Sequence, residues 1–192
     1  MRVILERNAT QTALVGCLLV LLFVMPAFAG EAVLKDIAVT NTDSHLLLYF
    51  NVDDCFTEDM KKAIDSGIKT TFNFFVRVYE DRTFWWDKKI TDIKVSHDVQ
   101  YDNLKKVYMV RLFEKGDKTI FVQDFDEVKT LLSGIRGLKV AELENLKKGK
   151  SYQVRMMAEL DKIRLPLKLH NVFFFLSLWD FETDWYTMDF TY

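Results

Sequence analysis

The sequence has few of the residues that interrupt regular structure or crosslink a small fold. Its 192 residues include 7 glycines, 2 prolines and 2 cysteines. So little glycine and proline excludes the collagen-like and low-complexity classes. The hydrophobic content of 49%, with 16 phenylalanines, excludes a disordered chain. The formal net charge is only −2, so bulk electrostatics offers no attraction to nucleic acid, and we expect no nucleic-acid partner.

The sequence also lacks the short motifs that carry common enzyme chemistry. It contains no H-E-x-x-H zinc motif, no G-x-S-x-G nucleophile elbow, no P-loop and no G-x-G-x-x-G. The three histidines, His45, His97 and His170, are far apart, and His97 falls on the apolar face of a predicted strand, where a hydrogen-bonded core histidine is expected. The doublet Asp53-Asp54 lacks the context of a calcium loop and suits a turn or cap. We therefore expect no enzyme, no catalytic residue, no metal and no cofactor.

The first thirty residues have the organisation of a bacterial-type secretory signal peptide. Arg2 and Arg7 precede the apolar run ALVGCLLVLLFVM at residues 13–25, and the small-residue site A-F-A ends at Ala29. A membrane-spanning helix needs about 20 apolar residues, so this run is short for a permanent anchor. The pattern predicts a signal peptide over residues 1–29, cleavage after Ala29 and a periplasmic product.

Two other fates of this segment remain open. Without cleavage, residues 12–25 would anchor the protein in the membrane, and this would be its only membrane contact. Leu14-Val15-Gly16-Cys17 has the composition of a lipidation site. In lipoprotein signals, however, the apolar run precedes the cysteine, whereas here it mostly follows it, so a small residue inside a hydrophobic stretch is the favoured interpretation.

Cleavage would leave Cys55 as the only cysteine, so the exported domain cannot contain an internal disulfide. Pairing between two chains remains open. Asp53 and Asp54 precede this thiol directly, and negative charges raise a thiol pKa. We therefore expect a partly buried, unreactive thiol.

Several segments alternate apolar and polar residues with a period of two, which is typical of half-buried antiparallel strands. The run VFFFLSL at residues 172–178 is apolar on both faces and predicts a central strand. The apolar positions of the alternating segments are Phe72, Phe74, Val76 and Val78; Ile93, Val95, Val99 and Tyr101; Tyr152, Val154, Met156, Ala158 and Leu160; and Tyr186, Met188, Phe190 and Tyr192.

Two segments break this alternation and predict short helices. Thr57 can cap a helix that Gly67 ends, and Asp124 and Glu127 have capping-box spacing before a helix that Gly134 ends. Turns are expected at residues 114–117 and 147–150. The chain thus predicts a mainly β fold. We expect an antiparallel β-sandwich of about eight or nine strands with two short helices, in a single domain over residues 30–192.

The segment RTFWWDKK at residues 82–89 places Trp85 and Trp86 side by side. In a strand, adjacent side chains point to opposite faces, so we expect one tryptophan to enter the core and the other to cover the outer face, an edge or a ligand. The residues expected to form a binding or structural network, if their polar ends converge, are Arg82, Trp85, Trp86, Asp87, Arg155, Asp161 and Trp185.

An ordered set of residues across the predicted domain resembles the bacterial domain of unknown function numbered 4390. No single piece of the set is specific, but the order is. One position departs from the family pattern, in which we expect proline after the Gly-Ile step, because this chain has Lys69 there. The matching residues are Ala63-Ile64, Gly67-Ile68, Phe72, Arg82, Trp85-Trp86-Asp87, Phe121, Phe125, Glu127-Val128, Leu131-Leu132, Leu146, Gly149, Tyr152, Val154-Arg155, Leu160-Asp161, Leu165-Pro166-Leu167, Leu178-Trp179, Trp185-Tyr186 and Phe190.

This resemblance implies an exported protein of Gram-negative bacteria without an established activity. It also implies genes close to a membrane sensor histidine kinase of the nitrogen-regulation type. The expected function is therefore a periplasmic, non-enzymatic binding or interaction domain whose partner is a membrane or envelope protein. Two alternatives remain open. One is an outer-membrane β-barrel, suggested by the alternation at residues 186–192. The other is an envelope hydrolase with an unrecognised carboxylate site.

Overall fold

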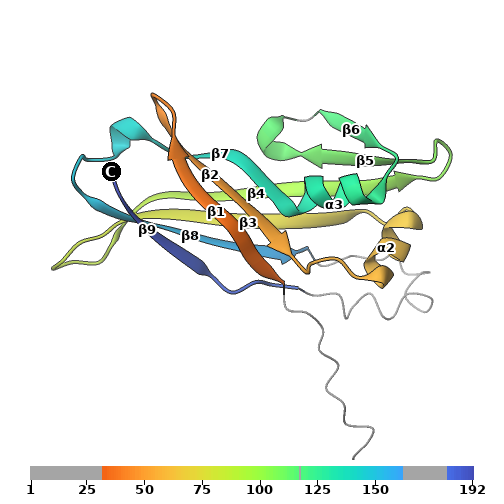
Figure 1. Ribbon diagram of the computed structural model, residues 1–192, viewed down its shortest axis with the longest axis horizontal. Helices are drawn as coiled ribbons and strands as arrows, with labels where there is room; N and C mark the ends of the chain where they lie inside the picture. The colour runs from red at the N-terminus through yellow and green to blue at the C-terminus, as the bar shows by residue number, and fades with distance from the viewer. Residues whose placement is uncertain (1–31, 117, 162–180) are drawn as a thin grey trace, which may run out of the picture. The chain divides into compact units, whose positions relative to one another are not determined.

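The computed structural model describes residues 32–116, 118–161 and 181–192 (Figure 1). Residues Glu31–Tyr192 form one compact unit. The described residues contain two α-helices, α2 (Glu58–Asp65) and α3 (Phe125–Ser133), and two short 3₁₀ helices, η1 (Phe113–Lys115) and η2 (Leu143–Asn145). The strands are β1 (Val33–Asn41), β2 (His45–Asp53), β3 (Thr70–Glu80), β4 (Lys88–Asp102), β5 (Val107–Leu112), β6 (Thr119–Val122), β7 (Gly134–Glu142), β8 (Ser151–Leu160) and β9 (Tyr186–Thr191).

The described strands form two open, fully antiparallel sheets rather than one closed sheet. The smaller sheet has the order β1-β2-β7, and the larger has the order β6-β5-β4-β3-β8-β9. The chain passes from the small sheet to the large one through α2, and returns through α3, which leads directly into β7 (Figure 1). The predicted fold class, an antiparallel sandwich with two short helices, is confirmed.

The core lies between the facing sides of the two sheets. Phe72, Phe74, Val76 and Val78 of β3 are all fully buried. The ring of Phe50 in β2 meets that of Phe74 edge to face, with 5.7 Å between centroids, so the two sheets interlock there. The apolar positions of β8, from Tyr152 to Leu160, are buried in the same cluster. The period-two alternation therefore identified the inner faces of both strands correctly.

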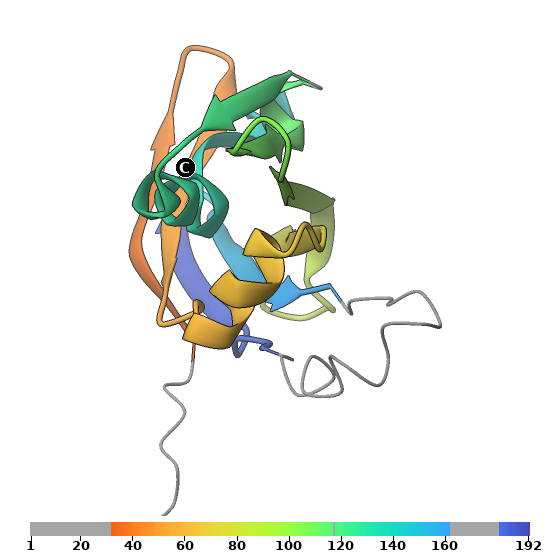
Figure 2. The same cartoon turned by 90° about the vertical axis from the view of Figure 1, so that its right-hand side faces the viewer.

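Both predicted helices are present and capped at the expected residues. The hydroxyl of Thr57 accepts a hydrogen bond from the Met60 amide at 3.2 Å, and Gly67 follows α2 with a φ of 86°. Asp124 caps α3 by accepting from the Asp126 amide at 3.2 Å. Helix α3 contacts strands of both sheets, and Figure 2 shows the two helices together at one end of the sandwich.

The prediction that Trp85 and Trp86 lie in a strand, with one of them buried, is wrong. The β3–β4 pairing ends at Glu80 opposite Lys88, and residues 81–87 form the loop of this hairpin. Both Trp85 and Trp86 are exposed, so neither is a core residue. Phenylalanine and tryptophan favour strands and the segment has no glycine or proline, so its local sequence resembles strand although it turns.

Several predictions concern residues outside the described part of the chain. These are the signal peptide over residues 1–29, cleavage after Ala29 and the central strand over residues 172–178. The alternatives of an anchor over residues 12–25 and of lipidation at Cys17 also lie outside it. In the described segments no helix is both long and apolar enough to span a bilayer.

Candidate functional site

The outer face of the large sheet carries a cluster built around two arginines. Arg77 of β3 and Arg155 of β8 lie directly opposite each other in the antiparallel register. Like charges in this position repel, and each arginine has a carboxylate beside it. Arg77 Nε lies 3.3 Å from Asp92 Oδ1, and Arg155 Nη2 lies 3.5 Å from Asp87 Oδ2.

Aromatic rings hold both guanidinium groups in place. The Arg77 guanidinium carbon lies 4.5 Å from the centre of the Trp185 ring, and that of Arg155 lies 4.7 Å from the centre of the Tyr79 ring. Such stacking is favourable and leaves the edges of the guanidinium free to donate hydrogen bonds. We call Arg77, Tyr79, Asp87, Arg155 and Trp185 the arginine face. Its arginine side chains remain 37% and 38% exposed, so this cluster is open to solvent.

Gln153 adds a hydrogen-bond acceptor at the margin of the arginine face. Its Oε1 accepts from Nη2 of Arg155 at 2.7 Å and from Nε at 3.3 Å. The contact between Arg155 and Asp87, at 3.5 Å, is longer than the 2.7–2.9 Å of a strong charge-assisted hydrogen bond. Arg155 is thus oriented by Tyr79 and Gln153 and only loosely paired with Asp87.

Next to the arginine face, the β3–β4 hairpin extends past the last residues that pair with β8. Its loop, drawn in yellow-green, reaches beyond the neighbouring strands (Figure 1). Phe84, Trp85 and Trp86, which we call the aromatic tip, are 91%, 78% and 93% exposed. Arg82 and Lys88 beside them are also exposed. The described chain therefore covers almost none of these three rings.

The predicted network is only partly assembled. Asp87, Arg155 and Trp185 gather on the arginine face, and Arg82, Trp85 and Trp86 lie in the adjoining loop. Asp161 is separate, because it follows the opposite end of β8, where its backbone amide donates to Thr71 O at 2.8 Å.

Arg77 and Tyr79 were missed, although the alternation of β3 placed both on its outer face. Their neighbours in sequence, Val76 and Val78, face the core. What the sequence could not reveal is that Arg77 lies opposite Arg155, since that depends on the pairing register between distant strands.

Asp81 lies where the arginine face meets the loop. Burial raises the pKa of this carboxyl, and the nearby charges of Asp87 and Asp189 raise it further, while Arg155 partly opposes them. Its backbone amide donates to Ser151 O at 3.0 Å, which ties the base of the loop to β8. The loop therefore begins from an anchored position.

His97 is a core residue, as predicted. Its Nδ1 donates to Leu132 O at 3.1 Å, and its Nε2 lies 3.0 Å from Glu114 Oε2. A carbonyl and a carboxylate both accept hydrogen bonds, so each ring nitrogen of His97 faces an acceptor. Burial alone would raise the pKa of Glu114, but the hydrogen bond and charge of His97 outweigh this and lower it. This buried pair joins β4 to η1 and α3.

Lys69, the departure from the expected family pattern, has a structural role. Its Nζ lies 2.7 Å from Asp98 Oδ2, which also lies 2.9 Å from Arg111 Nη2. Thr71 donates to the other oxygen of Asp98 at 2.8 Å. Asp98 is almost fully buried, so the lysine helps to compensate a carboxylate that would otherwise be costly to bury.

Cys55 is buried, and its Sγ donates to Val52 O at 3.4 Å. Burial raises the pKa of the thiol to about 12, with smaller contributions from Asp53 and Asp54. The raised pKa agrees with the prediction of an unreactive thiol, and burial contributes more to it than the neighbouring aspartates. Within the described ranges, no three histidine, cysteine, aspartate or glutamate side chains are grouped to hold a metal ion.

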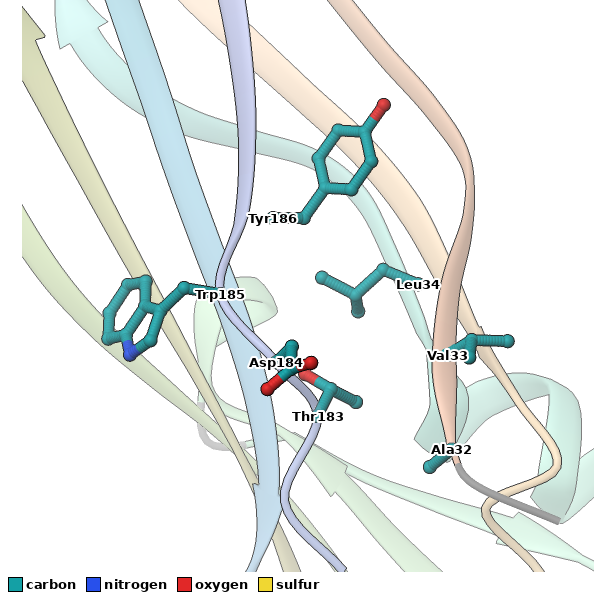
Figure 3. Close-up of a pocket in the computed structure, with 7 residues that line it drawn as sticks. All are labelled: Ala32, Val33, Leu34, Thr183, Asp184, Trp185 and Tyr186. Carbon is teal, nitrogen blue, oxygen red and sulfur yellow. The ribbon is translucent and has the colours of Figure 1, made fainter.

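A cleft of about 300 Å³ separates the edge of the small sheet from the chain that leads into β9. Figure 3 shows Leu34 and Tyr186 pointing toward each other across it, while Trp185 points away to the other side of its strand. The ring of Trp185 therefore belongs to the arginine face, although the residue also borders this cleft. The cleft is lined by Ala32, Val33, Leu34, Thr183, Asp184, Trp185 and Tyr186.

Comparison with known proteins places the chain in a family. A family model described as a domain of unknown function, DUF4390, matches residues 29–189, which is most of the chain. The resemblance inferred from the ordered residues is thereby confirmed. Neither the curated proteins nor the solved structures include a match to this chain.

Proposed function

The chain belongs to the DUF4390 family, and we propose that it is an exported, non-enzymatic binding domain whose contact surface is the arginine face. The observation that carries this proposal is the convergence of arginine, tyrosine and tryptophan side chains on one open sheet face. These residue types are enriched among the side chains that contribute most to protein–protein affinity.

The arginine face is prepared for binding in two respects. Stacking on Trp185 and Tyr79 already restricts both guanidinium groups, so little side-chain freedom is lost when a partner arrives. The loose pairing of Arg155 with Asp87 allows a carboxylate of the partner to replace Asp87 in a bidentate pair. The surface therefore suits a protein segment that presents carboxylates beside apolar side chains.

We propose a membrane or envelope protein as the partner, and the periplasmic part of a sensor histidine kinase as the first candidate. The support for export is the N-terminal arrangement of Arg2, Arg7, the apolar run over residues 13–25 and the site at Ala29. The support for the kinase is the expected gene neighbourhood of the family.

Site-specific photo-crosslinking in living cells tests the partner. A photoreactive amino acid replaces Gln153, at the margin of the arginine face, or Lys139, which is exposed on the small sheet. We expect a discrete adduct with one envelope protein from position 153 and none from position 139. The substitution Arg155→Glu should abolish the adduct, because it reverses the charge that the partner meets.

Arg136→Glu is the matched control, since Arg136 is an exposed arginine on the small sheet. The same adducts from both positions, or an adduct that survives Arg155→Glu but not Arg136→Glu, would remove the arginine face from the proposal.

Cell fractionation tests the location. We expect a soluble periplasmic product that lacks residues 1–29, whereas a full-length product in the membrane fraction would indicate the anchor over residues 12–25.

A further inference from the structure

The aromatic tip brings together three of the exposed large apolar side chains of the described residues, and its position makes it accessible. The β3–β4 pairing ends at Glu80 opposite Lys88, and β8 supports the hairpin only as far as the amide of Asp81. Phe84, Trp85 and Trp86 lie beyond that point, in the projecting loop of residues 81–87 (Figure 1). A projection of this kind can reach a flat surface without interference from the rest of the sheet.

The three rings are exposed at the same time, although they are consecutive in sequence. Each is at least 78% exposed. Covering all three rings at once requires a partner that reaches every ring, whichever way each one points. A fluid medium that surrounds the tip could do so. The interfacial layer of a lipid bilayer is such a medium, and tryptophan side chains concentrate there.

The charges beside the aromatic tip also fit a bilayer. Arg82 and Lys88 flank it and are both exposed, whereas Lys89 is paired with Asp92 at 2.8 Å. Long basic side chains can reach lipid phosphates while adjacent rings enter the apolar layer. Of the two nearby carboxylates, Asp87 is paired with Arg155 and Asp81 is partly buried at the base of the loop. The exposed charge closest to the rings is therefore predominantly positive, which complements anionic headgroups.

We propose that the aromatic tip inserts into the interfacial layer of a lipid bilayer, with Arg82 and Lys88 at the headgroup phosphates. The sequence predicted membrane contact only through the N-terminal segment, and only without cleavage, so the contact proposed here is a new one. It goes beyond the proposed function, because a tip seated in the membrane would bring the adjoining arginine face within reach of a membrane protein's external part.

Vesicle flotation of residues 30–192 tests this proposal. This fragment avoids binding through the apolar run over residues 13–25, and residues 31–192 form a compact unit with its own core. Vesicles of phosphatidylethanolamine with phosphatidylglycerol are compared with vesicles of neutral phosphatidylcholine. We expect flotation with the anionic vesicles, and a loss of about tenfold or more in binding when Phe84, Trp85 and Trp86 are all changed to serine.

Two further variants show which feature is responsible. Phe121→Ser is the matched control, because Phe121 is an exposed ring, 60% accessible, on the edge strand β6, and it should leave flotation unchanged. Changing Arg82 and Lys88 to glutamine should weaken binding to anionic vesicles more than to neutral ones.

Tryptophan fluorescence should shift to shorter wavelength when vesicles are added, and Trp85→Phe with Trp86→Phe should remove that shift while preserving flotation.

Equal flotation of the wild type and the triple serine variant would overturn the proposal, as would the absence of flotation in both. A specific protein adduct from a photoreactive group at Phe84, without vesicle binding, would assign the tip to a protein partner instead. In each of these cases, an adduct from position 153 that depends on Arg155 would leave the proposed function intact. Thermal unfolding at the wild-type temperature would show that each variant is folded.

Discussion

The two ends of the β3–β4 hairpin contain the same kinds of residue in opposite environments. At one end Phe72 and Phe74 are fully buried, whereas in the loop Phe84 and Trp86 are more than 90% exposed. The difference lies in what surrounds the hairpin. Strands β4 and β8 flank Phe72 and Phe74, and Phe50 of the small sheet packs on Phe74. In the loop only the two end residues contact a described strand, Asp81 through Ser151 and Asp87 through Arg155 of β8. Aromatic content therefore indicates neither core nor surface until the neighbouring strands are known.

Folding stability and binding therefore depend on different ends of this hairpin. Rings between the sheets contribute to the free energy of folding through burial. Rings in the loop contribute almost nothing to it in water, and their burial can take place only against another molecule. The same hairpin can thus serve the core at one end and binding at the other.

The largest expected effect lies at the buried end. Phe74→Ala should lower the free energy of unfolding by about 3–5 kcal/mol, since it removes a large ring from a closely packed interface between two sheets. Urea denaturation followed by circular dichroism measures this. The control is Phe121→Ala on β6, which should change stability by no more than about 0.5 kcal/mol. A small cost for Phe74→Ala would mean that the two sheets do not interlock at Phe50 and Phe74.

An intermediate effect is expected at the buried polar pair that lies beside this core. Glu114→Ala should cost about 1–3 kcal/mol near neutral pH, because His97 loses a buried partner. Glu114→Gln should cost less, because the amide nitrogen can donate a hydrogen bond to His97 Nε2 when that nitrogen carries no proton. Both are measured by urea denaturation, as for Phe74→Ala.

The same pair predicts a pH dependence with a definite sign. The pKa of Glu114 is lower in the folded protein than its ordinary value of 4.5. Its carboxylate therefore stabilises the fold fully above that value, and the contribution is lost as the pH falls through the lower, folded value. Wild type should lose more stability than Glu114→Gln over this acidic range. Parallel pH profiles for the two proteins would contradict the assigned role of Glu114.

Local features of the fold were predictable from sequence, whereas contacts between distant segments were not. Alternation of apolar and polar residues predicts the inner face of β3, and the capping chemistry of Thr57 predicts where α2 begins. The opposition of Arg77 and Arg155, and the contact of Glu114 with His97, depend on strand register and on the position of η1. Neither is encoded within a short window of sequence. The loop at residues 81–87 was misassigned for a related reason. Its residues favour strands, and the point at which strand pairing stops depends on where the distant strand β8 begins.

The smallest expected effect lies at the exposed end of the hairpin. Trp86→Ala should change the free energy of unfolding by no more than about 0.5 kcal/mol, because a side chain that is 93% exposed loses almost no packing when it is truncated. The same substitution in Trp85 should behave alike, at 78% exposure. Urea denaturation without vesicles measures both, beside Phe74→Ala under the same conditions. A cost close to that of Phe74→Ala would mean that the tip folds back onto the protein in solution, and the rings would then be unavailable for a bilayer.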